Sequence, residues 1–143
     1  MTRLVVLDTS ILVSAGLAQG PPTRLVDLAL RRELSMILCP DILREYLEVM
    51  HRPKFDKAGF PPGWLDRLLS MAARLPLDPP VWPIPLPDPK DATFLALAKV
   101  SGAALVTGNL KHFPSEARSG VAVYSPQAFL TRLADPGETD SGT

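Results

Sequence analysis

Leu4-Val5-Val6-Leu7 is an unbroken run of four apolar residues near the start of the chain. A strand with one face in water alternates polar and apolar residues, so an unbroken apolar strand is covered on both faces, as in parallel sheets. Further strands are predicted over 34–38, 103–107 and 121–124, with helical patterns between them. This alternation predicts an α/β fold with a central parallel sheet flanked by helices.

The helical patterns have recognisable starts and ends. Thr9 or Ser10 is expected to cap a helix that runs through Ala18, and Ser125-Pro126 supplies a cap and a first-turn proline for a last helix through Leu133. Seven of the sixteen prolines fall within 76–89, which predicts an extended connection, because proline lacks the backbone N–H and fixes φ. The remaining helices are predicted over 23–32, 41–51, 61–75 and 90–101.

Length and composition predict one domain over residues 1–133, followed by a small polar tail over 134–143 that we expect to be disordered. Hydrophobic residues make up 46% of the 143-residue chain, which is typical of a globular protein. Fifteen Lys and Arg balance fifteen Asp and Glu, so a broad basic face for nucleic acid is not expected. Any handling of nucleic acid would therefore take place at a local site.

The single cysteine, Cys39, has no partner for an internal disulfide and fits a reducing compartment. The sequence has no run of 18 apolar residues and no basic-then-apolar leader. We therefore expect a soluble protein of the cytoplasm that makes no contact with a membrane.

Two aspartates are placed where a ligand site is expected. Asp8 directly follows the first strand, and ligands of open α/β sheets bind beyond the carboxyl ends of the strands; alternatively, Asp8 caps the next helix. Asp91 shares a helix face with Phe94, Leu95 and Ala98, where an unpartnered carboxylate is costly. The alternative for Asp91 is a first-turn position that is stabilised by the helix dipole. Asp88 is expected to be the cap of that helix.

Glu45 lies at the border of the apolar face of the predicted helix over 41–51. That face comprises Ile42, Leu43, Tyr46, Leu47, Val49 and Met50. At a border position a side chain can pack against the core and still reach a cleft. Glu48 suits the solvated face of the helix, and Asp41 suits its N-cap. Helical geometry alone leaves the role of Glu45 open.

The segment after the strand over 103–107 is a fourth candidate. Gly108 and Asn109 favour a tight turn, yet the turn leaves the carboxyl end of a strand and presents Thr107, Asn109 and His112. A lone histidine such as His112 is more often a surface or packing residue than a ligand.

Carboxylates that converge on one sheet edge raise an energetic problem. Two like charges 4 Å apart repel by ~4 kcal/mol at an effective dielectric constant of 20. Such a cluster must protonate, spread apart or hold a cation. Oxygen ligands with few histidines favour Mg²⁺ or Mn²⁺ over Zn²⁺, and these ions support phosphodiester cleavage.

The chain resembles the PIN-domain family in an ordered set of residues. The set comprises Asp8-Thr9-Ser10 after a strand, Glu45 on a helix, residues 88–98, and residues 105–109 followed by Phe113. Within that family the chain is most similar to the toxin components of bacterial toxin–antitoxin pairs of the VapC type. The resemblance implies a three-layer α/β fold and Mg²⁺- or Mn²⁺-dependent cleavage of single-stranded RNA. It also implies a cognate antitoxin protein and a homodimer as partners.

The same resemblance assigns roles to individual residues. Asp8, Glu45 and Asp91 become the catalytic, metal-binding acids. Asp88 matches an additional acid, although its capping role competes. The family's fourth acidic position falls on Asn109, whose carbonyl oxygen can coordinate a metal but whose amide lacks the negative charge. The supporting hydroxyl residues are Thr9, Ser10 and Thr107.

Two other functions are compatible with parts of the pattern. The chain would be a non-catalytic binding module on the same scaffold if Asn109 marks an impaired metal site. An Asp-based phosphatase or phosphotransfer domain would also place Asp8 after the first strand. A phosphatase of the haloacid-dehalogenase type, however, needs a second acid two residues later, where this chain has Ser10.

Overall fold

A computed structural model of the chain describes residues 3–51 and 59–135. The expected disordered tail over 134–143 lies outside the described residues from position 136 onward. Ala134 is the C-cap of the last helix.

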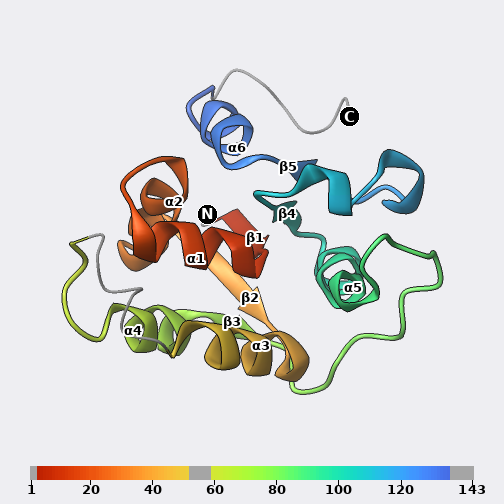
Figure 1. Ribbon diagram of the computed structural model, residues 1–143, viewed down its shortest axis with the longest axis horizontal. Helices are drawn as coiled ribbons and strands as arrows, with labels where there is room; N and C mark the ends of the chain where they lie inside the picture. Colours follow the sequence, from red (N-terminus) through yellow and green to blue (C-terminus); the bar gives the residue numbers. More distant parts are fainter. Residues whose placement is uncertain (1–2, 52–58, 136–143) are drawn as a thin grey trace.

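All strand pairs of the five-stranded sheet are parallel, in the order β3-β2-β1-β4-β5 (Figure 1). The side chains of Val5, Val6 and Leu7 in β1 are fully buried, as the unbroken apolar run predicts. The strands are β1 (Arg3–Leu7), β2 (Leu34–Leu38), β3 (Ala73–Arg74), β4 (Ala104–Val106) and β5 (Val123–Tyr124).

Helices cover both faces of this sheet. Figure 1 shows α5 on one side of the central strands and α1 and α2 on the other. The fold is thus the predicted α/β arrangement of a parallel sheet between helices. None of the helices in the described ranges is long and apolar enough to cross a membrane. The helices are α1 (Thr9–Leu17), α2 (Pro21–Leu30), α3 (Pro40–Met50), α4 (Trp64–Met71), α5 (Ala92–Ser101) and α6 (Pro126–Leu133).

The prediction of one helix over 61–75 is wrong at its end. α4 stops at Met71, and Ala73 and Arg74 form β3, which pairs with Ile37 and Leu38 of β2. Ala72 already has extended backbone angles, with ψ near 146°. A two-residue edge strand is too short to leave a periodic pattern in the sequence, and the pairing with β2 decides the conformation.

The predicted starts of three helices are also corrected. The N-cap of α1 is Asp8, which confirms the capping alternative for Asp8 and excludes Thr9 and Ser10 as the cap, and the Asp8 side chain accepts a hydrogen bond from the Ser10 N–H. α2 begins at Pro21 and α3 at Pro40, each with proline in its first turn, where the missing N–H costs nothing.

Asp41 is not the N-cap of α3 that the sequence predicted. Its backbone N–H donates to Asp78 Oδ1 over 2.8 Å, so a carboxylate from the proline-rich segment stabilises this helix start. Leu47, expected on the buried face of α3, is 48% exposed.

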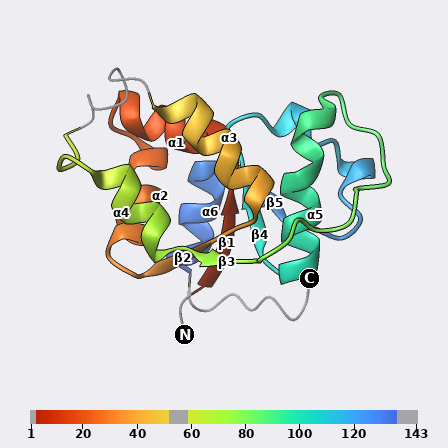
Figure 2. The same ribbon diagram turned by 90° about the horizontal axis from the view of Figure 1, so that it is seen from below.

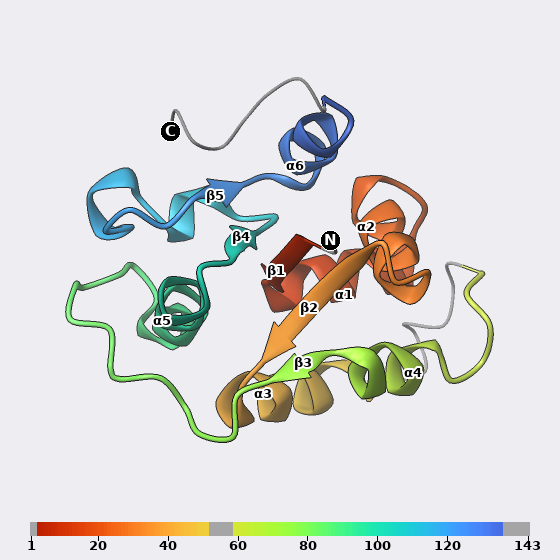
Figure 3. The same cartoon turned by 180° about the vertical axis from the view of Figure 1, so that it is seen from behind.

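The proline-rich segment has no helix or strand over 76–88, as predicted. Figure 3 shows it running from β3 past one end of α3 to α5. Trp82 anchors it, because its indole Nε1–H donates to the Ala117 carbonyl oxygen over 3.1 Å. The segment connects the edge strand β3 to α5, the helix that packs on β1 and β4.

Candidate functional site

The strand order reverses between β1 and β4, since the chain builds β2 and β3 on one side of β1 and β4 and β5 on the other. Such a switch point opens a crevice beyond the carboxyl ends of the two strands. Leu7 is paired with Val106 at the end of this ladder, and the Asp8 N–H extends it by donating to the Val106 carbonyl oxygen over 2.9 Å. Asp8 and Thr107, the residues that follow the two strands, therefore meet at the switch point.

Asp8 is 5% exposed and its carboxylate is held by hydroxyl groups. Thr107 Oγ1 donates to Asp8 Oδ2 over 2.6 Å, and Ser10 Oγ donates to the same oxygen over 3.1 Å. Two of the three predicted supporting residues, Ser10 and Thr107, thus contact the predicted acid. They come from opposite sides of the switch point.

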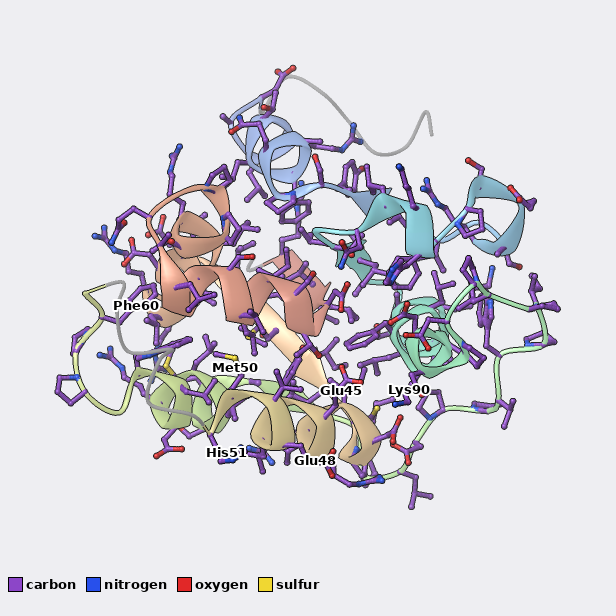
Figure 4. The ribbon with its side chains drawn as sticks, viewed as in Figure 1. Glu45, Glu48, Met50, His51, Phe60 and Lys90 are labelled. Carbon is purple, nitrogen blue, oxygen red and sulfur yellow. The ribbon has the colours of Figure 1, made fainter. Side chains whose placement is uncertain are left out.

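Glu45 is brought to this position by its neighbour on α3. The Tyr46 hydroxyl donates to the Leu7 carbonyl oxygen, which fastens α3 to the end of β1. Glu45 lies on the side of α3 nearer to α1, whereas Glu48 lies on the outer side (Figure 4). The Thr9 hydroxyl donates to Glu45 Oε2. The border position on the helix therefore does place Glu45 beside the residues that follow β1.

Burial raises the pKa of Glu45 above its usual value, and the charges of Asp8, Asp41 and Asp88 raise it further. The hydrogen bond from Thr9 acts in the opposite direction. A carboxyl group whose ionised form is disfavoured by neighbouring acids gains from a nearby cation.

Asp88 precedes a single turn of 3-10 helix, Pro89–Asp91, which ends with Asp91 and leads into α5. Asp88 Oδ1 accepts the Lys90 N–H over 3.0 Å, so Asp88 caps this turn rather than α5 itself, which the sequence had predicted to begin at Lys90. Asp91 stands at the N-cap position of α5, but its side chain makes no capping hydrogen bond. The helix start therefore does not account for the Asp91 carboxyl group, which is buried.

The Asp91 carboxyl group is instead in contact with a histidine: Asp91 Oδ2 lies 3.0 Å from His112 Nδ1. Burial raises the pKa of Asp91 to about 6, with further contributions from the charges of Asp8 and Asp88. His112 opposes this rise through its charge and its hydrogen bond. The contacts of Asp91 within the protein therefore do not offset the cost of burying its ionised carboxylate.

The structure brings the four predicted acids into one electrostatic neighbourhood at the switch point, since Asp8 and Asp88 act on both Glu45 and Asp91. They do not form a closed cage. Within residues 3–51 and 59–135, no group of three His, Cys, Asp or Glu side chains is arranged to hold a metal ion.

Asn109, the expected substitute for a fourth acid, takes part in the site through its backbone. Its N–H donates to Thr107 Oγ1 over 2.9 Å, and its carbonyl oxygen accepts the His112 N–H over 2.9 Å. The sequence favoured a surface or packing role for His112 over a role as a ligand, and it did not predict the contact of His112 with Asp91. The available signal was its place in the same strand-end loop as Thr107.

A hollow of about 430 Å³ adjoins the site on the side of this loop. Its lining combines polar and apolar surface and includes the exposed basic residue Lys111. The lining residues are Thr107, Gly108, Asn109, Leu110, Lys111, His112 and Ser125.

Comparisons with known proteins agree with this architecture. A family model described as PIN domain matches residues 4–111. Among the solved structures, the chain is similar to the crystal structure of PAE2754 from Pyrobaculum aerophilum, with a TM-score of 0.54 and 19% sequence identity. That match covers 94% of this chain and 98% of the other, and it shows the shared fold. A search of the curated proteins finds no match.

Proposed function

We propose that this chain, which belongs to the PIN-domain family, is an Mg²⁺- or Mn²⁺-dependent endoribonuclease that hydrolyses single-stranded RNA. The PIN domain is generally a metal-dependent nuclease fold. For this chain in particular we propose the nuclease activity, the metal and the RNA substrate.

The observation that carries the proposal is the position of Asp8. It is buried at the switch point of the sheet, it is held by two hydroxyl donors, and it raises the pKa of both Glu45 and Asp91. Capping of α1 explains why Asp8 accepts the Ser10 N–H, but it does not explain the two further acids whose pKa Asp8 raises. A cation at this point would offset the repulsion between the acids.

The donor set fits a hard divalent cation. All four candidate ligand side chains, Asp8, Glu45, Asp88 and Asp91, are carboxylates, which suit Mg²⁺ and Mn²⁺. Mg²⁺ is commonly held by one or two carboxylates and keeps several waters, so it does not require a closed protein cage. We assign Asp8 and Asp91 as the main metal ligands, Glu45 as the third acid, and Asp88 and the side-chain oxygen Oδ1 of Asn109 as further candidates.

When bound, the cation would lower the pKa of the attacking water and offset negative charge on the phosphate. The chain contributes the orientation. Thr107 and Ser10 hold the carboxylate of Asp8, and Thr9 holds that of Glu45. The reaction is hydrolysis: one P–O bond forms from water, the P–O bond to the leaving ribose oxygen breaks, and no covalent enzyme intermediate arises.

The hollow beside the site supports a nucleic-acid substrate. Lys111 is exposed on its rim, and Lys90 is exposed next to Asp91. Each lysine can meet a backbone phosphate on one side of the acids. The net charge of the chain is zero, so attraction for RNA would come from a few basic residues at the site rather than from a broad basic face.

The proposal is tested by incubating a labelled single-stranded RNA with the purified chain in Mn²⁺, in Mg²⁺ and in a chelator. We expect cleavage only with the metals, and its loss in Asp8→Asn and Asp91→Asn. Asp66→Asn is the matched control, because Asp66 is exposed on α4 and lies outside the site. A chelator-resistant activity, or full activity of Asp8→Asn, would contradict the proposal.

For the biological role, we propose a toxin of the VapC type that acts in the cytoplasm as a homodimer and is inhibited by an antitoxin protein. An apolar hollow on the outer face of α3 supports a protein partner, since it is lined by Pro40, Leu43 and the exposed Leu47. Co-expression with the product of a neighbouring short reading frame should yield a stable complex and relieve growth inhibition.

The same assays separate the alternatives. A non-catalytic binding module would retain partner binding but would show neither RNA cleavage nor stabilisation by Mn²⁺. A phosphatase or phosphotransfer domain would form a phospho-aspartate on Asp8. Ser10 occupies the position of that enzyme's second acid and donates to Asp8.

A further inference from the structure

The loop that follows β4 contacts both of the main acids, although these acids lie 83 positions apart in the chain. At its beginning, Thr107 Oγ1 donates to Asp8 Oδ2 over 2.6 Å. At its end, His112 Nδ1 lies 3.0 Å from Asp91 Oδ2. The loop therefore joins the carboxylate at the end of β1 to the carboxylate at the start of α5.

Hydrogen bonds inside the loop connect these two contacts. Thr107 Oγ1 accepts the Asn109 N–H over 2.9 Å while donating to Asp8. The Asn109 carbonyl oxygen accepts the His112 N–H over 2.9 Å, which closes the 3-10 turn Leu110–His112. Each step from Asp8 to Asp91 along this path is a contact between specific atoms, so the imidazole is presented to Asp91 by a structured backbone.

A second contact fastens the loop to α1. The Gly108 N–H donates to Ser10 Oγ over 3.1 Å. A Cβ atom at position 108 would lie 3.3 Å from the same oxygen, which is tighter than ordinary contact. Gly108 thus allows the backbone to approach the hydroxyl that holds Asp8.

His112 is the side chain that the Asp91 carboxyl group contacts in place of a helix N–H. The Asp91 side chain is 13% exposed and makes no capping hydrogen bond to α5. A carboxylate without such a contact can rotate about its Cβ–Cγ bond. The nearby capping aspartate, Asp88, is fixed by the Lys90 N–H and has no comparable need.

We propose that His112 is a positioning residue for Asp91. Its Nδ1–H donates to Asp91 Oδ2 and fixes the plane of the carboxylate, which leaves Oδ1 for the divalent cation. This inference rests on the proposed function. His112, rather than Asn109, is then the residue of this loop that supports the acid at the start of α5.

Removal of a side chain that orients a metal ligand typically weakens metal affinity 10- to 100-fold. We therefore expect His112→Ala to bind Mn²⁺ more weakly by about that factor. Asparagine carries an N–H donor on Cγ, where histidine carries Nδ1, so His112→Asn should restore most of the affinity. In glutamine the donor lies one carbon further out, so His112→Gln should restore less.

The experiment is calorimetric titration of each variant with MnCl₂ in the absence of RNA. His51→Ala is the matched control, because His51 is the only other histidine and its ring contacts the Glu48 carbonyl oxygen on the far end of α3. Thermal unfolding in a chelator reports whether each variant is folded. If His112→Ala does not fold, the comparison of His112→Asn with His112→Gln decides the matter.

The expected order of Mn²⁺ affinity is wild type, Asn, Gln and Ala, with His51→Ala equal to wild type. Wild-type affinity in His112→Ala, or an Asn variant no better than the Ala or Gln variant, would overturn the positioning role and leave the proposed function standing. A wild-type chain that binds no Mn²⁺ would overturn both.

Discussion

Thr107 Oγ1 donates a hydrogen bond to Asp8 Oδ2 over 2.6 Å, although the two residues are 99 positions apart in the chain. The Thr107 side chain is fully buried, and its oxygen also accepts the Asn109 N–H. This one hydroxyl therefore links the ends of two neighbouring strands to the loop that reaches Asp91. It is the most central contact of the site.

Thr107→Val should lower the free energy of unfolding by about 1–3 kcal/mol, because valine has a similar shape but removes one of the two hydroxyl donors of Asp8 Oδ2 and leaves the Asn109 N–H without its acceptor. Urea unfolding in a chelator measures this change. Thr107→Ser keeps the hydroxyl and should retain most of the hydrogen-bond energy. Equal stability of the Val variant and wild type would show that the hydroxyl makes no net contribution.

Asp91→Asn should abolish RNA cleavage and yet stabilise the metal-free protein at pH 8. The folded protein holds the Asp91 proton up to a pKa of about 6, whereas an unfolded aspartate loses it near 3.8. The stabilisation from protonated Asp91 is thus fully present below pH 4 and is lost as the pH rises through 6. A shift of about two pKa units corresponds to about 3 kcal/mol.

The measurement is the free energy of unfolding at several pH values in a chelator. Compared with wild type, Asp91→Asn should lose the fall in stability between pH 4 and pH 7. An identical pH dependence of the two proteins would contradict the assignment of that titration to Asp91.

The affinity of the wild-type chain for Mn²⁺ should fall below pH 6, because a proton competes with the cation for Asp91. With one proton displaced, the apparent affinity decreases up to tenfold for each pH unit below the pKa of about 6. Calorimetric titration at pH 5, 6 and 7.5 tests this dependence. A constant affinity across this range would mean that Asp91 is not a ligand.

Thr9→Val should raise the pKa of Glu45 further, since the Thr9 hydroxyl donates to the ionised carboxylate and opposes the effect of burial. We expect the pH at which RNA cleavage is half-maximal to move upward in this variant, while Thr9→Ser leaves it unchanged. A pH–rate profile measures the change. An unshifted Val profile would remove Glu45 from the titrating groups that matter for activity.

Asp78→Ala should destabilise the fold by about 0.5–2 kcal/mol, the range for loss of a helix cap, because Asp78 Oδ1 accepts the Asp41 N–H at the start of α3. Asp66→Ala on α4 is the control with an exposed carboxylate. Thermal unfolding compares the two. A Tm for Asp78→Ala equal to that of Asp66→Ala would show that the long-range cap does not contribute.

The sequence predicted those features that depend on neighbouring residues. The apolar run of β1 and the Ser125-Pro126 start of α6 are confirmed, and Ser125 Oγ accepts the Ala128 N–H as an N-cap should. Figure 2 shows α5 opposite α2 and α4, with the strands between them, as the alternation of strands and helices predicts. Local periodicity and capping chemistry were sufficient for these elements.

The features that were missed depend on residues far apart in the chain. β3 exists because Ala73 and Arg74 meet β2, and the start of α3 is stabilised by Asp78 from the proline-rich segment. The contact of His112 with Asp91 requires the loop after β4 to turn back onto α5. Residue spacing within one segment cannot predict these contacts, because each joins residues from different segments. The burial of Asp91 could be predicted, because Asp91 lies on the apolar face of its own helix.

Asp8 after β1, Glu45 on α3 and Asp91 at the start of α5 are proposed to share one hard divalent cation. The most direct measurement is anomalous scattering from a crystal of the wild-type chain soaked in MnCl₂. We expect one strong peak at the switch point, within direct coordination distance (about 2.1 Å for a hard divalent ion) of an Asp8 or Asp91 carboxylate oxygen. A fully soaked crystal without a peak beside either carboxylate would contradict it.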